Sequence, residues 1–147
     1  VTYLLGSVSS PLAGRLAIER GYRTVTPLTL LLVGAGLALT LVDHLAAVVG
    51  GVGLITFGFF ACHGTVSSWV SARAANKGRG TGMAGAMYLA FYYFGSSVFG
   101  ALAGSAWSAA GWPGVAGLSG CLVAVALALA VSMRWVPPVP DPAPTRG

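Results

Sequence analysis

Long apolar runs separated by short polar connections dominate the chain. Four of these runs are each close to the length of a membrane span, and a shorter apolar stretch precedes them. A helix needs about 20 apolar residues to cross the hydrocarbon core of a bilayer. The pattern predicts spans over residues 24–42, 45–70, 83–106 and 114–133. We therefore expect an all-α fold, a polytopic membrane helix bundle whose four complete spans occupy residues 24–135.

The two ends of the chain follow a different pattern. Residues 1–14 are apolar but too few to cross a bilayer, so we expect a truncated transmembrane helix belonging to a longer protein. Residues 136–147 hold most of the prolines. Because proline-rich segments favour extended or irregular conformations, we expect a disordered tail there.

Lysine and arginine lie only in alternate connections. They cluster in residues 15–23, in residues 71–82 and after the last apolar run, whereas the two intervening connections contain none. Short cytoplasmic loops of membrane proteins carry such residues and exported loops avoid them. We therefore expect a multi-pass protein of the bacterial inner (plasma) membrane with a cytoplasmic C-terminus. The net charge of +5 lies in membrane-flanking connections, which favours lipid headgroups over nucleic acid as neighbours.

Polar side chains concentrate in the second and third spans, while the first and fourth are nearly uniform Leu, Val and Ala. Each set follows one stripe of its helix, and the two stripes are Thr56, His63 and Ser67, then Tyr88, Tyr92 and Ser96. Polar groups are costly in lipid, so these stripes should face protein or a water-filled cavity. The short connection between the spans makes them antiparallel, which brings the histidine and the tyrosines to similar depth.

Two interpretations of His63 remain open. It is the only histidine or charged side chain deep within a complete span, and imidazole changes its charge near neutral pH, as proton exchange requires. A lone histidine in a helix can instead bond a neighbouring serine or carbonyl and only hold the bundle together.

The small residues Ser96, Gly100 and Gly104, and Gly50 and Gly51, predict close helix packing.

The sequence contains few residues that could act in catalysis or bind a metal ion. The chain has only three carboxylates, Glu19, Asp43 and Asp141, which lie in predicted connections or in the tail. Cys62 and Cys121 fall at different predicted depths, and we interpret them as free, buried thiols. We expect no enzyme activity, no metal and no cofactor.

The first basic connection resembles a known family motif. Residues 14–17 (Gly-Arg-Leu-Ala) and 20–23 (Arg-Gly-Tyr-Arg) resemble the signature turn of the major facilitator superfamily, Gly-x-Leu-Ala-Asp-Arg-x-Gly-Arg-Lys. Residues 92–100 and 59–64 look like helices eleven and ten of its bacterial efflux-type, arabinose-efflux-permease-like members. The resemblance implies a partial C-terminal half, from the end of helix eight through helix twelve. The residues of the implied cytoplasmic turn are Gly14, Arg15, Glu19, Arg20, Gly21 and Arg23.

One departure from the motif concerns its acidic residue. Ile18 occupies the position of the aspartate in the family motif, and Glu19 is the next residue. In the family this residue helps to hold one face of the transporter closed through charge pairs. Glu19 could substitute by pairing with Arg73 or Lys77, or it could remain solvated. An exposed ion pair contributes only about 0–1 kcal/mol, so both alternatives stay open.

The resemblance also implies a function. It suggests a secondary transporter that exports a small organic solute or drug by proton antiport through alternating access, with the missing N-terminal half, the substrate and the lipid bilayer as partners. Helices ten and eleven would line the cavity, while nine and twelve would lie outside. The implied substrate and ion pathway then consists of His63, Thr56, Ser67, Tyr88, Tyr92 and Ser96. The alternative is a non-transporting membrane scaffold or a small oligomeric membrane protein.

Overall fold

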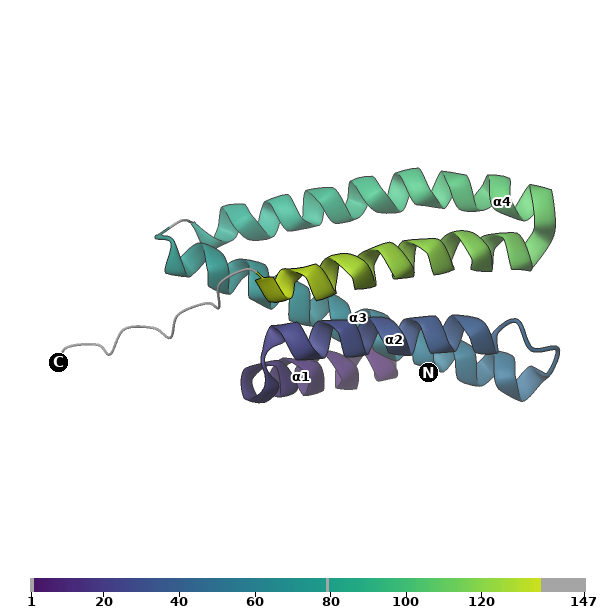
Figure 1. The fold of residues 1–147 in the computed structure, drawn as a ribbon, viewed down its shortest axis with the longest axis horizontal. Coiled ribbons are helices and arrows are strands. Elements are labelled where there is room, and N and C mark those ends of the chain that lie inside the picture. Colours follow the sequence, from purple (N-terminus) through teal and green to yellow (C-terminus); the bar gives the residue numbers. More distant parts are fainter. Residues whose placement is uncertain (1, 79, 136–147) are drawn as a thin grey trace.

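The apolar runs fold into long helices that lie antiparallel to one another. The computed structural model describes residues 2–78 and 80–135. Its elements, drawn in Figure 1, are α1 (Thr2–Arg20), α2 (Tyr22–Leu39), α3 (Leu45–Asn76), α4 (Thr81–Ser132) and the short 3₁₀ helix η1 (Met133–Trp135). The described residues contain no strand. The predicted fold class, an all-α membrane helix bundle, is therefore confirmed.

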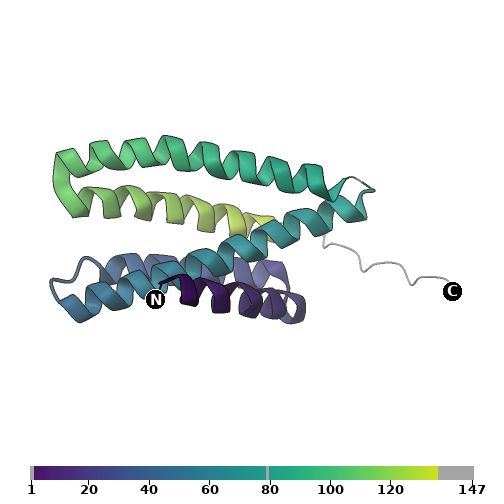
Figure 2. The same cartoon turned by 180° about the vertical axis from the view of Figure 1, so that it is seen from behind.

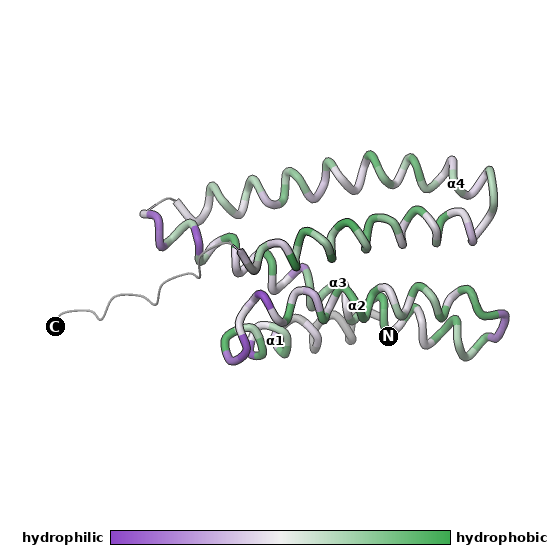
Figure 3. Tube along the Cα trace, viewed as in Figure 1, coloured by the Kyte–Doolittle hydropathy of each residue, from purple (hydrophilic) through white to green (hydrophobic). Residues whose placement is uncertain are grey.

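Within the described part of the chain, three helices, α2, α3 and α4, are long and apolar enough to cross a membrane. With 52 residues, α4 would extend about 78 Å if it were straight, which is far more than one crossing. It bends back at Ala110 and Gly111 into two antiparallel arms, residues 81–109 and 112–132 (Figure 1). Figure 3 shows hydrophobic residues along the middle of the helices and hydrophilic ones toward their ends, as expected for membrane spans.

The connection between the arms of α4 is shorter than the sequence suggested. We expected the helices to stop at residue 106 and to resume at residue 114. The backbone departs from helical geometry only at Ala110 (φ −146°) and Gly111 (φ 61°, ψ −146°). The second of these conformations is open only to glycine, which lacks a Cβ atom. The chain therefore reverses within two residues, and Trp107 stays helical.

The predicted turn over residues 15–23 is confined to one residue. α1 remains helical through Arg20, and the chain reverses at Gly21 with φ 82° before α2 begins at Tyr22. A positive φ costs glycine little, so no longer loop is needed. The ring of Tyr22 stacks on Trp69 of α3, with centroids 6.1 Å apart, and fixes this turn against the longer helix.

α2 occupies a more central position than we expected for the first complete span. It contacts α1, α3 and α4, and its buried residues are Val25, Thr26, Pro27, Thr29, Gly36 and Leu37. Leu37 also approaches Gly120 in the C-terminal arm of α4. Figure 2 shows the other side of the bundle, where α1 lies along α3. The expectation that this span lies outside was wrong within this chain, because uniform Leu, Val and Ala suit helix packing as well as lipid contact.

α2 and α3 approach each other closely at glycines. A Cβ atom on Gly51 would lie 2.6 Å from the carbonyl oxygen of Gly36, and one on Gly58 would lie 2.9 Å from the carbonyl oxygen of Thr29. By contrast, Gly100 and Gly104 of α4 have no atom within 4 Å of the added Cβ position. Within the described chain, the small-residue ladder of the third span packs against nothing, whereas Gly51 does pack closely.

Substituting Gly51 by alanine is expected to destabilise the bundle by about 1 kcal/mol. Overpacking costs roughly 1–3 kcal/mol, and the better helix propensity of alanine returns up to about 1 kcal/mol. Thermal unfolding in detergent, followed by circular dichroism, measures the change. Gly50→Ala is the matched control, because Gly50 is the adjacent residue and faces open space. Equal stability of the two variants would contradict the close approach of α2 and α3.

Candidate functional site

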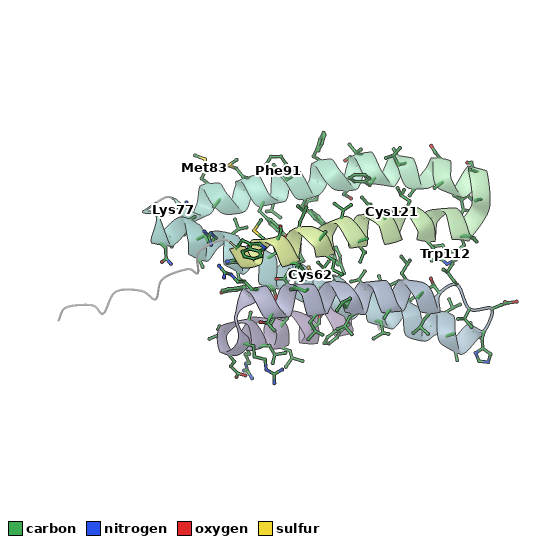
Figure 4. The ribbon with its side chains drawn as sticks, in the orientation of Figure 1. Cys62, Lys77, Met83, Phe91, Trp112 and Cys121 are labelled. Carbon is green, nitrogen blue, oxygen red and sulfur yellow. The ribbon has the colours of Figure 1, made fainter. Side chains whose placement is uncertain are left out.

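A cavity of about 520 Å³ lies between α2, α3 and both arms of α4. Aromatic and aliphatic side chains form most of its wall. The described residues that line it include no carboxylate and no lysine or arginine. They are Leu30, Val33, Phe59, Cys62, His63, Tyr88, Tyr92, Ser119, Leu122, Val123 and Ala126. Figure 4 labels Cys62, which α3 contributes to this wall.

The central polar contact of the cavity joins α3 to the N-terminal arm of α4. The hydroxyl oxygen of Tyr88 lies 2.9 Å from Nδ1 of His63. When the imidazole is neutral and carries its proton on Nε2, Nδ1 accepts this hydrogen bond from the phenol. When both ring nitrogens are protonated, Nδ1 donates to the phenol oxygen instead. The same pair therefore stays satisfied in both protonation states of His63.

Aromatic rings surround this histidine on several sides. The centroid of the His63 ring lies 5.1 Å from that of Tyr92 and 5.3 Å from that of Tyr88. Phe59, one turn earlier on α3, stacks on the imidazole at 6.0 Å with an interplanar angle of 19°. Aromatic faces carry partial negative charge, so this arrangement suits flat rings and tolerates a positive charge on the imidazole.

The structure brings together three of the six predicted pathway residues: His63, Tyr88 and Tyr92. Thr56 lies on the same face of α3 but about 10 Å further along the helix, and it does not line the cavity. The hydroxyl of Ser67 donates to the carbonyl of Gly64 at 3.3 Å, within its own helix.

Ser96 is exposed and also lies outside the cavity. Side chains four residues apart on a helix differ in direction by about 40°. Ser96, eight residues after Tyr88, therefore points about 80° away from it. The tyrosines therefore face α3 while the serine does not.

Sequence reasoning missed two polar or aromatic contributors to the cavity wall. Phe59 precedes His63 by four residues and so shares its stripe, but it was overlooked because only polar residues were followed. Ser119 lies on the C-terminal arm of α4, which we had assigned to broad lipid contact. A single serine within an otherwise aliphatic run was the signal that could have identified it.

The two cysteines differ in their surroundings. Cys62 is half-buried at the cavity, whereas Cys121 is exposed on the C-terminal arm of α4, so the expectation that both are buried was wrong for the second. Both are free thiols. Among the described residues, no group of three histidine, cysteine, aspartate or glutamate side chains is arranged to hold a metal ion.

The residues of the signature motif lie at the end of the bundle where α1 meets α2. Gly14, Arg15, Glu19 and Arg20 occupy the last turns of α1, and Gly21 makes the reversal. Arg23 lies in the first turn of α2, and the side chain of Glu19 is exposed.

A tryptophan joins the opposite end of the bundle. Trp112, next to the reversal of α4, donates from Nε1 to both the carbonyl oxygen and the hydroxyl of Thr40, each at 3.1 Å. Thr40 follows the last residue of α2. This contact fastens the reversal between the two arms of α4 to the end of α2, at the side of the bundle that lacks basic residues.

Several known membrane transporters are similar to this chain. The uncharacterized MFS-type transporter YybF of Bacillus subtilis is 37% identical over 141 residues, which is 96% of this chain and 34% of that protein. An uncharacterized transporter of Buchnera aphidicola is 32% identical over 91% of this chain and 32% of its own length. The inner membrane transport protein YnfM of Escherichia coli is 43% identical over 48% of this chain and 16% of its own.

The chain thus spans about a third of the length of the first two of these curated relatives. No protein-family model and no solved structure matches it. The relatives nevertheless cover nearly the whole chain, and the apolar helices fit a multi-pass membrane protein. The resemblance to the major facilitator superfamily is therefore confirmed: the chain is similar to an MFS-type transporter over nearly its whole length.

Proposed function

We propose that this chain forms part of a secondary transporter that exports a small organic solute by proton antiport through alternating access. The cavity between α2, α3 and α4 is one wall of its substrate pathway, and His63 is the group that takes up and releases the proton. The names of the relatives support transport as the activity, and substrate sites of such transporters lie near the bilayer midplane between helices.

The observation that carries the proposal is the bond between His63 and Tyr88. An ionisable group within a membrane is costly and is often functional. Because the phenol can either donate to or accept from Nδ1, the hydrogen bond between Tyr88 and His63 can persist whether Nδ1 is bare or protonated. A purely structural histidine would need only one of these two states.

The wall of the cavity supports a substrate that is flat and mainly apolar. Phe59, Tyr88 and Tyr92 offer ring faces, and Ser119 offers a hydroxyl. The described lining residues include no carboxylate that would anchor a strongly cationic solute. An aromatic organic solute or drug fits this chemistry best.

We further propose that the chain corresponds to the C-terminal half of such a transporter and that its basic connections face the cytoplasm. The charge pattern supports this orientation, since Lys and Arg lie in alternate connections. The N-terminal arm of α4 exposes Phe91, Tyr93 and Phe94 within about one helical turn. A second set of helices, from the remaining length seen in the relatives, would cover this arm and complete the cavity.

Proton-coupled flux tests the proposal. A protein of the relatives' length that contains this chain is reconstituted in liposomes with a pH-sensitive dye inside, and a panel of aromatic solutes is added. A transported solute should move protons in the opposite direction, with saturation. The chain of 147 residues alone should produce no such signal, because alternating access needs two halves.

Each other outcome of this experiment favours a named alternative. Saturable flux by the 147-residue chain alone would support a small oligomeric transporter instead. Solute flux without proton movement would contradict antiport. No flux of any solute by the longer protein would favour the membrane scaffold.

A further inference from the structure

A second cavity, also of about 520 Å³, lies where α3 ends and α4 begins. It shares no lining residue with the cavity around His63. The basic groove, as we call it, is lined by Arg73, Ala74, Lys77, Gly80, Met83, Ala84 and Met87. Figure 4 labels Lys77, which directly follows α3, and Met83 of α4 at this end of the bundle.

The two walls of the basic groove differ in chemistry. Arg73 lies in the last turn of α3 and Lys77, four residues later, directly follows that helix, so both cations lie at its end. Met83 and Met87 have the same spacing on α4, and their side chains are 72% and 55% exposed. One wall is thus cationic and the other is apolar and adaptable, since thioether side chains are flexible and polarizable.

The length of α3 and its aromatic residues support a position of the groove at the depth of the lipid headgroups. α3 has 32 residues, or about 48 Å of helix, which exceeds the roughly 30 Å of the hydrocarbon core. Trp69, stacked on Tyr22, precedes Arg73 by one turn, and tryptophan and tyrosine favour the membrane–water interface. The cations of the groove therefore follow immediately after an interfacial aromatic pair, while the methionines lie on the helix that returns into the membrane.

We propose that the basic groove binds one anionic phospholipid, with its phosphate at Arg73 and Lys77 and the first part of an acyl chain along Met83 and Met87. Guanidinium and ammonium groups both bind phosphate, and basic clefts between transmembrane helices suit anionic headgroups. A free phosphate would leave the methionine wall exposed. A lipid carries both the anionic group that suits the cationic wall and the hydrocarbon chain that suits the apolar wall. We therefore assign the groove to a lipid.

Native mass spectrometry of the full chain in detergent tests this assignment. Dioleoyl phosphatidylglycerol and dioleoyl phosphatidylcholine are added at equal concentration, and bound lipid is counted. We expect phosphatidylglycerol to bind at least tenfold more tightly, and the double variant Arg73→Gln/Lys77→Gln to lose about tenfold of that affinity. The matched control is Arg15→Gln/Arg20→Gln, which removes two positive charges from the turn between α1 and α2 and should change the affinity less than twofold.

Two further measurements separate the lipid from other sources of the same chemistry. Met83→Asn/Met87→Asn should weaken phosphatidylglycerol binding severalfold, and inorganic phosphate at the same concentration should not displace the lipid. If Arg73→Gln impairs folding, as judged by circular dichroism, Lys77→Gln alone serves, because that side chain is exposed at the end of α3.

Three results would overturn the proposal. The first is equal binding of the two lipids, and the second is an equal loss in the control variant. The third is displacement by inorganic phosphate at matched concentration, which would reassign the groove to a free anion. None of these readouts depends on transport, so the groove can fail while the transporter proposal stands.

Discussion

Replacing His63 by glutamine is expected to abolish proton-coupled transport in a protein of the relatives' length that contains this chain. Glutamine has a similar size and can still hydrogen-bond to Tyr88, but it cannot take up a proton near neutral pH. We expect flux driven by a pH gradient to fall at least a hundredfold, since general proton-transfer groups contribute roughly 10²–10⁴-fold in comparable roles. Counterflow of solute without a gradient should be retained, because the cavity keeps its shape.

His44→Gln is the matched control for this substitution. His44 is the other histidine of the chain, and it is exposed in the connection before α3. Flux is measured between about pH 5.5 and 8.5, the range across which histidine ordinarily changes its charge. The control should keep the normal pH dependence, whereas His63→Gln should show a flat profile. A normal profile in His63→Gln would reduce His63 to a structural residue.

The sequence was informative about which residues sit inside the membrane and which face of a helix they share. Long apolar runs without charge have few alternatives to membrane helices, which is why the all-α fold could be predicted. The stripe that contains His63 and the stripe that contains Tyr88 and Tyr92 follow from helix periodicity. The antiparallel return from α3 to α4 then places the two stripes at similar depth, and the structure joins them by a 2.9 Å contact.

Periodicity could not show which neighbour a face meets. The stripe of Tyr88 continues to Ser96, but the gradual rotation of the helix carries that serine to the exposed side. Two apolar spans, α2 and the C-terminal arm of α4, looked alike in sequence, yet both supply walls of the cavity. Leucine and valine pack equally well against lipid and against a helix, so composition alone does not distinguish the two environments.

Local backbone reversals were also hidden in the sequence. The chain turns within one residue at Gly21 and within two at Ala110 and Gly111, where we had expected connections of seven or more residues, and both glycines have a positive φ. Glycine is abundant in this chain, with 22 residues, and most of them lie within helices. Residue type alone does not distinguish a glycine that reverses the chain from one such as Gly51, which allows two helices to approach closely.

Replacing Tyr88 by phenylalanine is expected to slow proton-coupled transport by roughly tenfold or more while leaving the aromatic wall in place. The change removes only the hydroxyl that bonds Nδ1 of His63. A hydrogen bond to a charged partner contributes about 1.5–3 kcal/mol, which corresponds to roughly a tenfold to hundredfold effect. The loss should depend on pH, because the bond matters most to the protonated imidazole, whose Nδ1 proton then lacks this acceptor.

Tyr93→Phe is the matched control, because it removes the same hydroxyl from the same helix at a side chain that is 64% exposed and does not line the cavity. It should leave flux within about twofold of the parent, because the hydroxyl that bonds Nδ1 of His63 belongs to Tyr88 and stays in place. In a double variant with His63→Gln, the Tyr88 change should add little further loss, since the two residues act as one coupled pair. Equal effects of Tyr88→Phe and Tyr93→Phe, or full additivity with His63→Gln, would show that the hydrogen bond takes no part in proton exchange.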